Sequence, residues 1–323
     1  MRYPSSLRLA NLPTKLERLR KPLRKGHVEV YIKRDDLTGC VLSGNKVRKL
    51  EFIFADVIEK GCDTVITCGG VQSNHARATA FVAAKLGLKS VLVLRGEPPS
   101  EHDGNLFLDM LAGADSIFIS EEEYERIDEV MEDRKEELKL NGYRPYIIPE
   151  GASNELGVFG YIKAMEEMKD EARSIDIDAI ITACGSGGTY AGLLLGKKIF
   201  GVSAKIYGIN VCKTAEYFVE KIYRLCTEAI EKYNLGIKVC QEKIEIIDGY
   251  VGEGYARSWP EEIDLIKRMA QLEGIVLDPV YTGKAMFGLI KEIEKGRFRE
   301  GAKILFLHTG GIFGLFSRGL MPR

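Results

Sequence analysis

The first residue whose surroundings could support covalent chemistry is a lysine that follows a glycine and an asparagine. Lys46 lies in the stretch LSGNKVRKLEF, residues 42–52, with Asn45 before it as a candidate helix cap. At the first position of a helix, the helix dipole and partial burial both disfavour a protonated amine. A lysine whose pKa is lowered in this way can form a Schiff base with a carbonyl compound. By these residues alone, an ordinary surface lysine stays an open alternative.

A glycine-rich loop is the second feature with chemical potential. CGSGGTYAG, residues 184–192, follows an apolar run and opens a helical pattern. Backbone N–H groups at such a helix N-terminus can bind a phosphate, and Ser186 and Thr189 could add hydroxyl donors. The loop lacks the Gly-Lys-Ser/Thr of a Walker A motif, and Tyr190 occupies the sixth position of a dinucleotide fingerprint. A small phosphate-bearing ligand is therefore favoured, with a purely structural turn as the alternative.

The elements around these residues alternate between short β-rich runs and helical runs. Strands are expected at 28–37, 63–70, 90–96, 178–184, 204–211 and 302–307. Helices are expected at 45–61, 73–87, 104–114, 121–142, 187–201 and 263–274, and 144–161 is expected to connect two lobes. Strands separated by helices indicate an α/β fold with mostly parallel, twisted sheets flanked by helices. Arg48 and Lys49 are expected to be helix-surface cations, although either could support a phosphate.

Composition excludes several classes of partner and site. The 323 residues carry a formal net charge of −1, which gives no electrostatic reason to bind nucleic acid or a membrane surface. No run approaches the ~20 apolar residues of a membrane helix, and the N-terminus lacks a signal peptide's apolar region. We therefore expect a cytoplasmic protein. The 7 cysteines and 4 histidines show no metal-ligand spacing, so no metal site is expected, and Cys68 and Cys184 are expected to be buried.

Five motifs together resemble one family. YIKRDDLTG…SGNKVRKLEF, GGVQSNHARATA, GSGGTYAGL, DPVYTGKAM and HTGG occur in the order found in fold type II pyridoxal-phosphate enzymes, the tryptophan synthase β group. Within that group they resemble the branch that holds D-cysteine desulfhydrase and 1-aminocyclopropane-1-carboxylate (ACC) deaminase. The resemblance runs from about Tyr31 to Gly311. It implies a large cofactor-binding domain of residues 1–51 and 158–323, a small domain of residues 52–157, and a homodimer.

The resemblance also assigns roles to individual residues. Lys46 matches the lysine that binds pyridoxal phosphate covalently and moves the Cα proton. Residues implied to hold the cofactor are Asn74 at its ring oxygen, Thr309 at its pyridine nitrogen and the phosphate loop, Gly185, Ser186, Gly187, Gly188 and Thr189. Residues implied to act on the substrate are Ser73, Asn74 and His75 at its carboxylate, Thr282, and two active-site tyrosines, Tyr281 and Tyr255. The family usually has Gly-Gly-Asn-Lys at the lysine, where this chain has Ser43 first.

Two threonines decide between the reactions of this branch. ACC deaminases place an acidic residue after the Tyr of DPVY and a leucine before the final glycines, where this chain has Thr282 and Thr309. A neutral hydroxyl near the pyridine nitrogen makes a weaker electron sink than a carboxylate does, adequate for expelling a good β leaving group. We therefore expect β-elimination, with D-cysteine giving pyruvate, hydrogen sulfide and ammonia. The alternatives are ACC deamination, elimination from cysteate or another β-substituted alanine, and a binder without catalytic activity.

Overall fold

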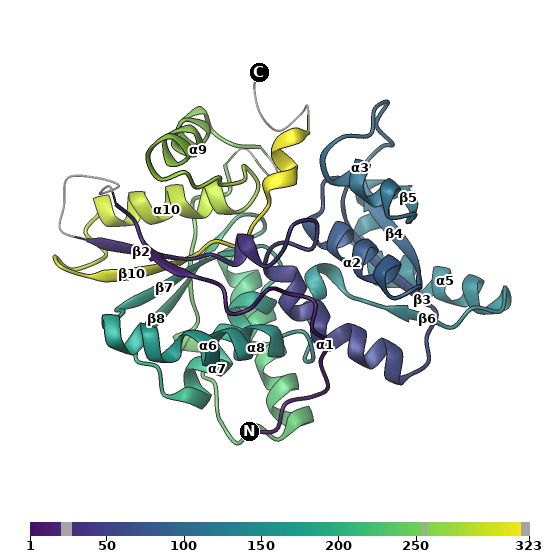
Figure 1. Ribbon diagram of the computed structural model, residues 1–323, viewed down its shortest axis with the longest axis horizontal. Coiled ribbons are helices and arrows are strands. Elements are labelled where there is room, and N and C mark those ends of the chain that lie inside the picture. Colours follow the sequence, from purple (N-terminus) through teal and green to yellow (C-terminus); the bar gives the residue numbers. More distant parts are fainter. Residues whose placement is uncertain (21–27, 253, 255–256, 318–323) are drawn as a thin grey trace.

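Two mostly parallel sheets form the two lobes of the molecule (Figure 1). The computed structural model describes residues 1–20, 28–252, 254 and 257–317. The large sheet has the strand order β1-β2-β10-β7-β8-β9, and only β1 runs antiparallel to its neighbour. Its strands are β1 (Leu16–Arg18), β2 (Glu29–Lys33), β7 (Ala179–Cys184), β8 (Lys205–Asn210), β9 (Glu245–Ile247) and β10 (Lys303–Leu307). These strands and the helices around them confirm the predicted α/β class.

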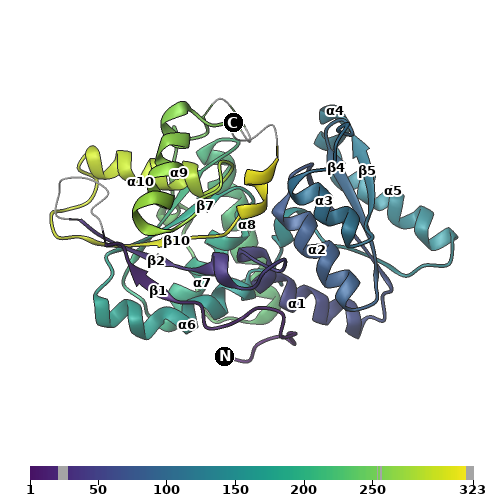
Figure 2. The same cartoon turned by 45° about the horizontal axis from the view of Figure 1, so that its top comes forward.

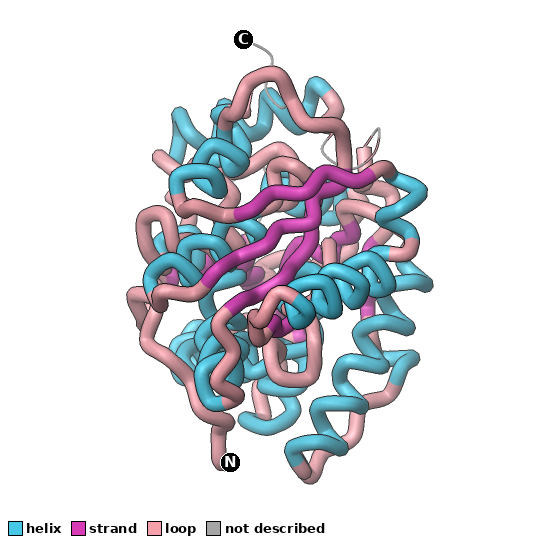
Figure 3. Tube along the Cα trace, turned by 90° about the vertical axis from the view of Figure 1, so that its right-hand side faces the viewer, coloured by secondary structure: helices cyan, strands magenta, loops and turns pink. Residues whose placement is uncertain are grey.

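The small sheet is parallel throughout and has the order β5-β4-β3-β6. Its strands are β3 (Thr64–Gly70), β4 (Lys89–Arg95), β5 (Asp115–Ile119) and β6 (Pro145–Ile147). Seen from the side of this lobe, the strands lie side by side between helices (Figure 3). All strands of the small sheet fall inside 52–157 and all strands of the large sheet outside it. The domain boundaries themselves stay a prediction, and the first of them falls within a helix, α1 (Asn45–Glu59).

Helices cover both faces of each sheet, which explains why the strands are apolar on both sides. On the large sheet, α6 (Phe159–Ile175), α7 (Gly188–Phe200) and α8 (Ala215–Tyr233) lie on one face, and α9 (Pro260–Glu273) and α10 (Thr282–Glu294) on the other (Figure 2). On the small sheet, α2 (Asn74–Lys85) and α3 (Gly104–Leu111) pack on one face. The opposite face carries α5 (Ile127–Leu140), which α4 (Glu121–Glu125) precedes.

Alternation along β4 shows how sequence builds these layers. Val91 and Val93 join the core under α5, whereas Leu92 and Leu94 join the core under α2 and α3. Successive side chains of a strand point to opposite faces, so a run of apolar residues fills both cores at once. Cys68 is buried in the core under α5 and Cys184 in the core of the large sheet, so both are buried as predicted. None of the helices in the described ranges is long and apolar enough to span a membrane.

The first turn of α1 differs from the prediction. Gly44 caps the helix with φ 92°, Asn45 is its first residue, and no side chain caps it. A Cβ at Gly44 would lie 2.7 Å from the carbonyl oxygen of Thr309, so both the backbone angle and the space require glycine here. Ser43 has no positive φ. The departure from the family pattern at Ser43 therefore leaves the turn intact.

Three further expectations need correction. The helix expected over 121–142 is broken at Arg126 into α4 and α5. The segment 144–161 is more than a connection, because it contains β6 and the 3₁₀ turn η2 (Glu150–Ala152). Arg48 and Lys49 are 1% and 0% exposed, so neither is a surface cation. Arg48 donates to Asp35 at 2.8 and 2.9 Å and to Glu167 at 2.8 and 3.1 Å, which makes it the centre of a buried ion network.

Candidate active site

A pocket opens at the carboxyl ends of β3 and β7, between the two lobes. Ligands of parallel α/β sheets bind at this edge. Its walls come from the start of α1, the β3–α2 turn, η2, the β7–α7 loop, and the segments that precede α10 and follow β10. The lining includes most of the predicted site residues: Lys46, Ser73, Asn74, His75, Gly185, Ser186, Gly187, Thr189, Tyr281 and Thr309.

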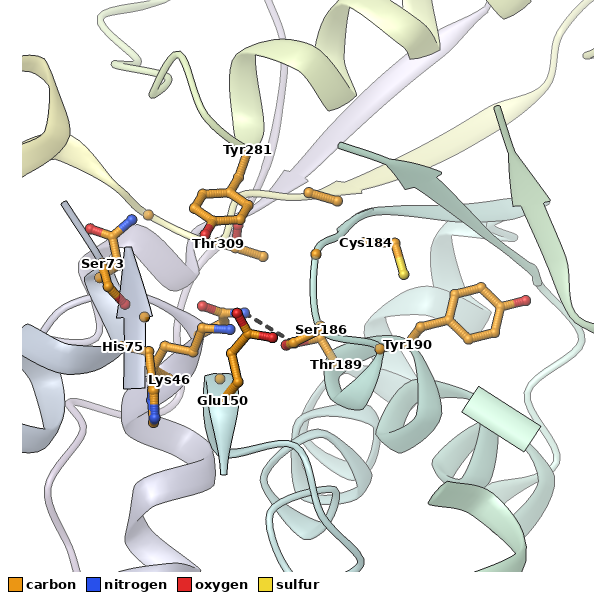
Figure 4. A pocket seen from close by; sticks show the side chains of 18 of the residues that line it. Lys46, Ser73, His75, Glu150, Cys184, Ser186, Thr189, Tyr190, Tyr281 and Thr309 are labelled. Atoms are coloured by element: carbon orange, nitrogen blue, oxygen red, sulfur yellow. Dashed lines mark hydrogen bonds between the residues drawn. The ribbon is translucent and has the colours of Figure 1, made fainter. Parts of the chain in front are cut away.

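Lys46 extends into this pocket from the first turn of α1 (Figure 4). Burial lowers the pKa of its amine to about 8, and the negative charge of Glu150 opposes this effect. The backbone of η2 runs past the amine, since a Cβ at Gly151 would lie 3.1 Å from Lys46 Nζ. A substantial fraction of the amine is therefore neutral near pH 8, which is the form that attacks a carbonyl.

Lys49 lies one turn further along α1 and beneath the glycine loop. Its Nζ donates to the Gly151 carbonyl oxygen and to Ser153 Oγ, both at 3.1 Å, and Ser153 in turn donates to Ser186 Oγ at 2.9 Å. Burial, and then the charge of Lys46, lower the pKa of Lys49 well below its usual range. An anion bound above this amine would favour its protonated form and raise the pKa again, so Lys49 can serve as a charged donor once the anion is present.

The glycine loop has the geometry of an anion site. Gly187 caps α7 with φ 82°, and a Cβ at Gly188 would lie 2.6 Å from Ser153 Oγ and 2.9 Å from Lys49 Nζ. The backbone thus approaches its neighbours as closely as only glycine allows. Asn45 Nδ2 donates to Thr189 Oγ1 at 3.0 Å, which ties the start of α1 to the start of α7. The helix N-terminus, the Ser186 and Thr189 hydroxyls and buried Lys49 form a donor set that fits a phosphate monoester.

The N-terminus of α2 also reaches the pocket. Ser73 caps this helix, and its Oγ accepts from Ala76 N at 3.2 Å. Asn74 is the first residue of the helix, and its Oδ1 accepts from Asn105 Nδ2 at 3.2 Å, which fixes the amide in place. A Cβ at Gly69 would lie 2.4 Å from Ser73 Oγ, so position 69 of β3 must be glycine for the turn to form. The position suits a substrate carboxylate.

His75 lies beside Lys46, but its ring points away from Ser73 and Tyr281 (Figure 4). Its Nε2 is 2.7 Å from Thr67 Oγ1, and the Thr67 hydroxyl donates to the Ile148 carbonyl at 2.8 Å. Burial, and then the charges of Lys46 and Lys49, lower the pKa of His75 well below its usual range. The geometry therefore describes a neutral histidine that packs under the lysines. The predicted contact of its ring with a substrate carboxylate has no support here.

Tyr281 and Thr309 stand on the side of the pocket away from Lys46 (Figure 4). A Cβ at Gly185 would lie 2.8 Å from Tyr281 Cε1, so the tyrosine ring lies directly against the phosphate loop. Thr282 is not in the pocket lining. It is fully buried, its hydroxyl donates to Asp278 Oδ1 at 2.6 Å, and it accepts from Asp278 N at 2.8 Å. Thr282 is therefore placed to fix the backbone of Tyr281 rather than to touch a substrate.

Two site residues need separate mention. Tyr255, predicted as a second active-site tyrosine, lies outside the described residues. Glu150 lines the pocket beside Lys46, although it was not among the residues expected to form the site. The signal that could have revealed it is its place directly before Gly151, at the end of the PYIIPEG run.

Comparisons with known proteins agree with this geometry. A family model described as pyridoxal-phosphate dependent enzyme matches residues 7–310. A Thermotoga maritima protein named "Putative 1-aminocyclopropane-1-carboxylate deaminase" is 47% identical over 309 residues, which cover 95% of this chain and 96% of the relative. The mitochondrial bifunctional D-cysteine desulfhydrase/1-aminocyclopropane-1-carboxylate deaminase of Arabidopsis thaliana is 42% identical over 322 residues, 96% of this chain and 79% of the relative.

A solved structure extends the agreement to three dimensions. The crystal structure of an ACC deaminase homologue superposes with a TM-score of 0.90 at 41% identity, over 98% of this chain and 94% of that one. The match confirms the predicted fold type II architecture. The pocket residues fit the cofactor of that family, with an anion cradle for its phosphate and a pKa-lowered lysine for its aldehyde. This chain belongs to the pyridoxal-phosphate-dependent enzymes, in the group that includes ACC deaminases and D-cysteine desulfhydrases.

Proposed function

We propose that the enzyme catalyses β-elimination from D-cysteine. One D-cysteine and one water give one pyruvate, one hydrogen sulfide and one ammonia. Bound pyridoxal phosphate supplies the electron sink that accepts the pair left when Cα loses its proton. The protein's own part is to hold the cofactor, orient the amino acid and move protons.

The pocket residues divide this work by position. The glycine loop, Asn45 and Lys49 hold the phosphate, while Tyr281 packs against that loop. Ser73 and the α2 N-terminus bind the substrate carboxylate. Lys46 takes the proton from the substrate Cα, and the protonated amine can then donate it to the departing sulfur. Its lowered pKa suits both steps, because a base works best when its pKa lies near the working pH.

The observation that supports elimination is a neutral hydroxyl, Thr309, on the side of the pocket away from Lys46. The carboxylate of Asp278 is nearby, since a Cβ at Gly311 would lie 2.6 Å from it. Its Oδ1 accepts from Thr282 N and Oγ1, and its Oδ2 from Val280 N and Tyr281 N, so these backbone groups occupy it. A neutral partner for the pyridine nitrogen favours a weak electron sink, which suffices for a thiolate leaving group.

The test is a panel of amino acids offered to the holoenzyme, with pyruvate, 2-oxobutyrate and sulfide measured. D-cysteine should give pyruvate and sulfide in equal amounts, and ACC should give little 2-oxobutyrate. Lys46→Ala should abolish turnover, and borohydride reduction of the wild type followed by peptide mapping should find the pyridoxyl group on Lys46. Faster ring opening of ACC than sulfide release from D-cysteine would contradict the proposal.

ACC deamination is the second candidate. The names of the Thermotoga and Arabidopsis relatives favour it, and the same lysine, serine and tyrosine positions could serve it. Replacement of Thr309 by Glu offers the sharper test of the electronic argument, because Thr309 faces the pocket and Thr282 does not. If the ring-nitrogen partner decides the reaction, Thr309→Glu should lower sulfide release and raise 2-oxobutyrate formation. Thr309→Gln, which has the same shape without the charge, is the control.

A further inference from the structure

Glu150 is a pocket carboxylate that the roles given above do not use. In the part of the chain that the structure describes, no other Asp or Glu lines the pocket. Its side chain points into the pocket next to the amino end of Lys46 (Figure 4). The next residue, Gly151, passes so close that a Cβ there would lie 3.1 Å from Lys46 Nζ. Glu150 therefore stands beside the group that must reach the reacting carbon.

A hydrogen bond from a tyrosine fixes the position of the Glu150 carboxylate. Tyr124, on α4, donates its hydroxyl to Glu150 Oε1 at 2.9 Å. The guanidinium of Arg95 lies 5.0 Å from the centre of the Tyr124 ring. Burial, and then the charges of Cys68 and Glu150, raise the pKa of Tyr124, so the hydroxyl stays a donor over the working pH range. The tyrosine thus holds one carboxylate oxygen, and the charge remains turned toward the pocket.

A substrate places its β-substituent within reach of this charge. Lys46 must come to within ~3–3.5 Å of the Cα proton to remove it. The first atom of the β-substituent is only two bonds from Cα, so it lies in the same part of the pocket as Glu150. The α-carboxylate is directed elsewhere, to Ser73 and the N-terminus of α2. Glu150 is exposed, so water weakens its interactions, but at this short range it would still repel a negative charge on the β-substituent.

We propose that Glu150 selects substrates by the charge of their β-substituent. It rejects alanines with an anionic group, such as a sulfonate or carboxylate, and admits those with a neutral or cationic group. The proposal rests on the proposed function, since it assumes a β-substituted alanine as the substrate. It also narrows that function, because cysteate becomes a poor substrate and D-cysteine, whose thiol is neutral, remains a good one.

Binding of two isosteric amino acids separates charge from shape. Aspartate and asparagine differ by one charge at the same position, and neither carries a β leaving group. Their dissociation constants are measured for the holoenzyme from the change in visible absorbance, in both enantiomers. The wild type should bind asparagine at least about tenfold more tightly than aspartate, which corresponds to ~1.4 kcal/mol. Glu150→Gln should bring the ratio close to one.

Glu155→Gln is the matched control. Glu155 lies five positions along the same segment, but it pairs with Lys232 at 2.7 Å on the surface and does not line the pocket. It should keep the wild-type ratio. Turnover adds a second measurement: the preference for β-chloroalanine over cysteate should fall in Glu150→Gln and stay unchanged in Glu155→Gln.

Two results would overturn the proposal. One is an asparagine-to-aspartate ratio, or a chloroalanine-to-cysteate ratio, that is the same in Glu150→Gln and the wild type. The other is an equal change for all amino acids together with altered affinity for pyridoxal phosphate, which would mean that Glu150 acts on the cofactor. A failure to release sulfide from D-cysteine would contradict the proposed function only, because the binding ratio needs no turnover.

Discussion

Lys46 shows how far single residues can be judged from sequence. Its place between Asn45 and a helix predicted a lowered pKa, and the structure supplies the cause, which is burial under the pocket. The two cations after it were misjudged, because an amphipathic pattern does not show that a second helix covers the outer face. Arg48 and Lys49 are buried since α6 and η2 pack against α1. Glu150 was missed because a contact between residues that are remote in sequence, such as Glu150 and Lys46, leaves no pattern in the sequence.

The protonation of Lys46 gives a pH prediction at this scale. Only the neutral amine reacts with an aldehyde, so covalent attachment of pyridoxal phosphate to the apoenzyme should speed up as pH rises. A pKa of about 8 predicts the midpoint there, whereas an ordinary lysine would give ~10.4. The measurement is the rate of the absorbance change between pH 6 and pH 10, relative to a lysine model compound. A midpoint equal to that of the model compound would refute the assignment.

Among the elements, the β7–α7 loop was predicted correctly as a glycine turn that opens a helix. The sequence could not say why each glycine is needed. Gly187 supplies a positive φ, whereas Gly188 leaves room for Ser153 and Lys49, which belong to other elements. The short strands β1, β6 and β9 have only three residues each, too few for an alternating pattern to be recognised in the sequence. They are strands because they pair with a neighbouring strand in the folded sheet.

Substitution of Gly187 tests the loop. Gly187→Asp should raise the dissociation constant for pyridoxal phosphate more than Gly187→Asn does, by at least about tenfold, because the two share a shape and differ in charge next to the phosphate. Gly201 closes the same helix with φ 65° and has free space around it. Gly201→Asp therefore has similar backbone strain without the phosphate and should leave cofactor affinity unchanged. Equal affinities for Gly187→Asp and Gly187→Asn would assign the loop a structural role only.

The buried ion network of α1 is the second element to test. Burial opposes it, but hydrogen bonds from Arg48 and Lys33 lower the pKa of Glu167 to about 2. Arg48→Met would leave Asp35 and Glu167 without their main partner, and removing one side of a buried pair typically costs ~3–5 kcal/mol. The free energy of unfolding should fall by that order in a denaturant titration. Lys232→Met, which removes a surface pair with Glu155, should cost less than ~1 kcal/mol.

The same network predicts a dependence on acid. The pKa of Glu167 is about 2 in the folded protein and ordinarily 4.5, so its contribution to stability is complete above 4.5. This contribution to stability should be lost as the pH falls from 4.5 toward about 2. In Arg48→Met the loss of stability over this range should be smaller, because the carboxylate no longer gains as much on folding. If the free energy of unfolding falls equally with pH in both proteins, the pKa of Glu167 does not depend on Arg48.

At the scale of the whole molecule, alternating strands and helices predicted parallel sheets correctly. Which strands are neighbours was beyond the sequence. β2 pairs with β10, which lies at the far end of the chain. In sequence, the strands of the small sheet and β7, β8 and β9 lie between these two neighbours. The pocket exists only where both sheets meet, since β3 and α2 supply one wall and β7 and α7 another.

Removal of the cofactor should therefore weaken both lobes together. A ligand that binds only the folded state at about 1,000 times its dissociation constant adds ~4 kcal/mol. The apoenzyme should unfold several degrees below the holoenzyme in calorimetry, with peptides of both sheets losing hydrogen-exchange protection. Lys46→Ala with noncovalent cofactor should fall between the two. Destabilisation confined to the large sheet would mean that the small lobe contributes little to cofactor binding.

The small sheet is a single insertion between β2 and β7, so the described chain passes between the lobes twice, along α1 and along the segment from β6 to α6. Lys49 joins these two passages where it donates to Gly151 and Ser153. Because the two connecting segments are joined at one point, the lobes can rotate about that point more easily than they can move apart. New chain ends placed at Gly142, where free space surrounds the backbone, would keep both connecting segments intact. A circular permutant opened there should retain the pocket, whereas one opened at Ser153 should lose it.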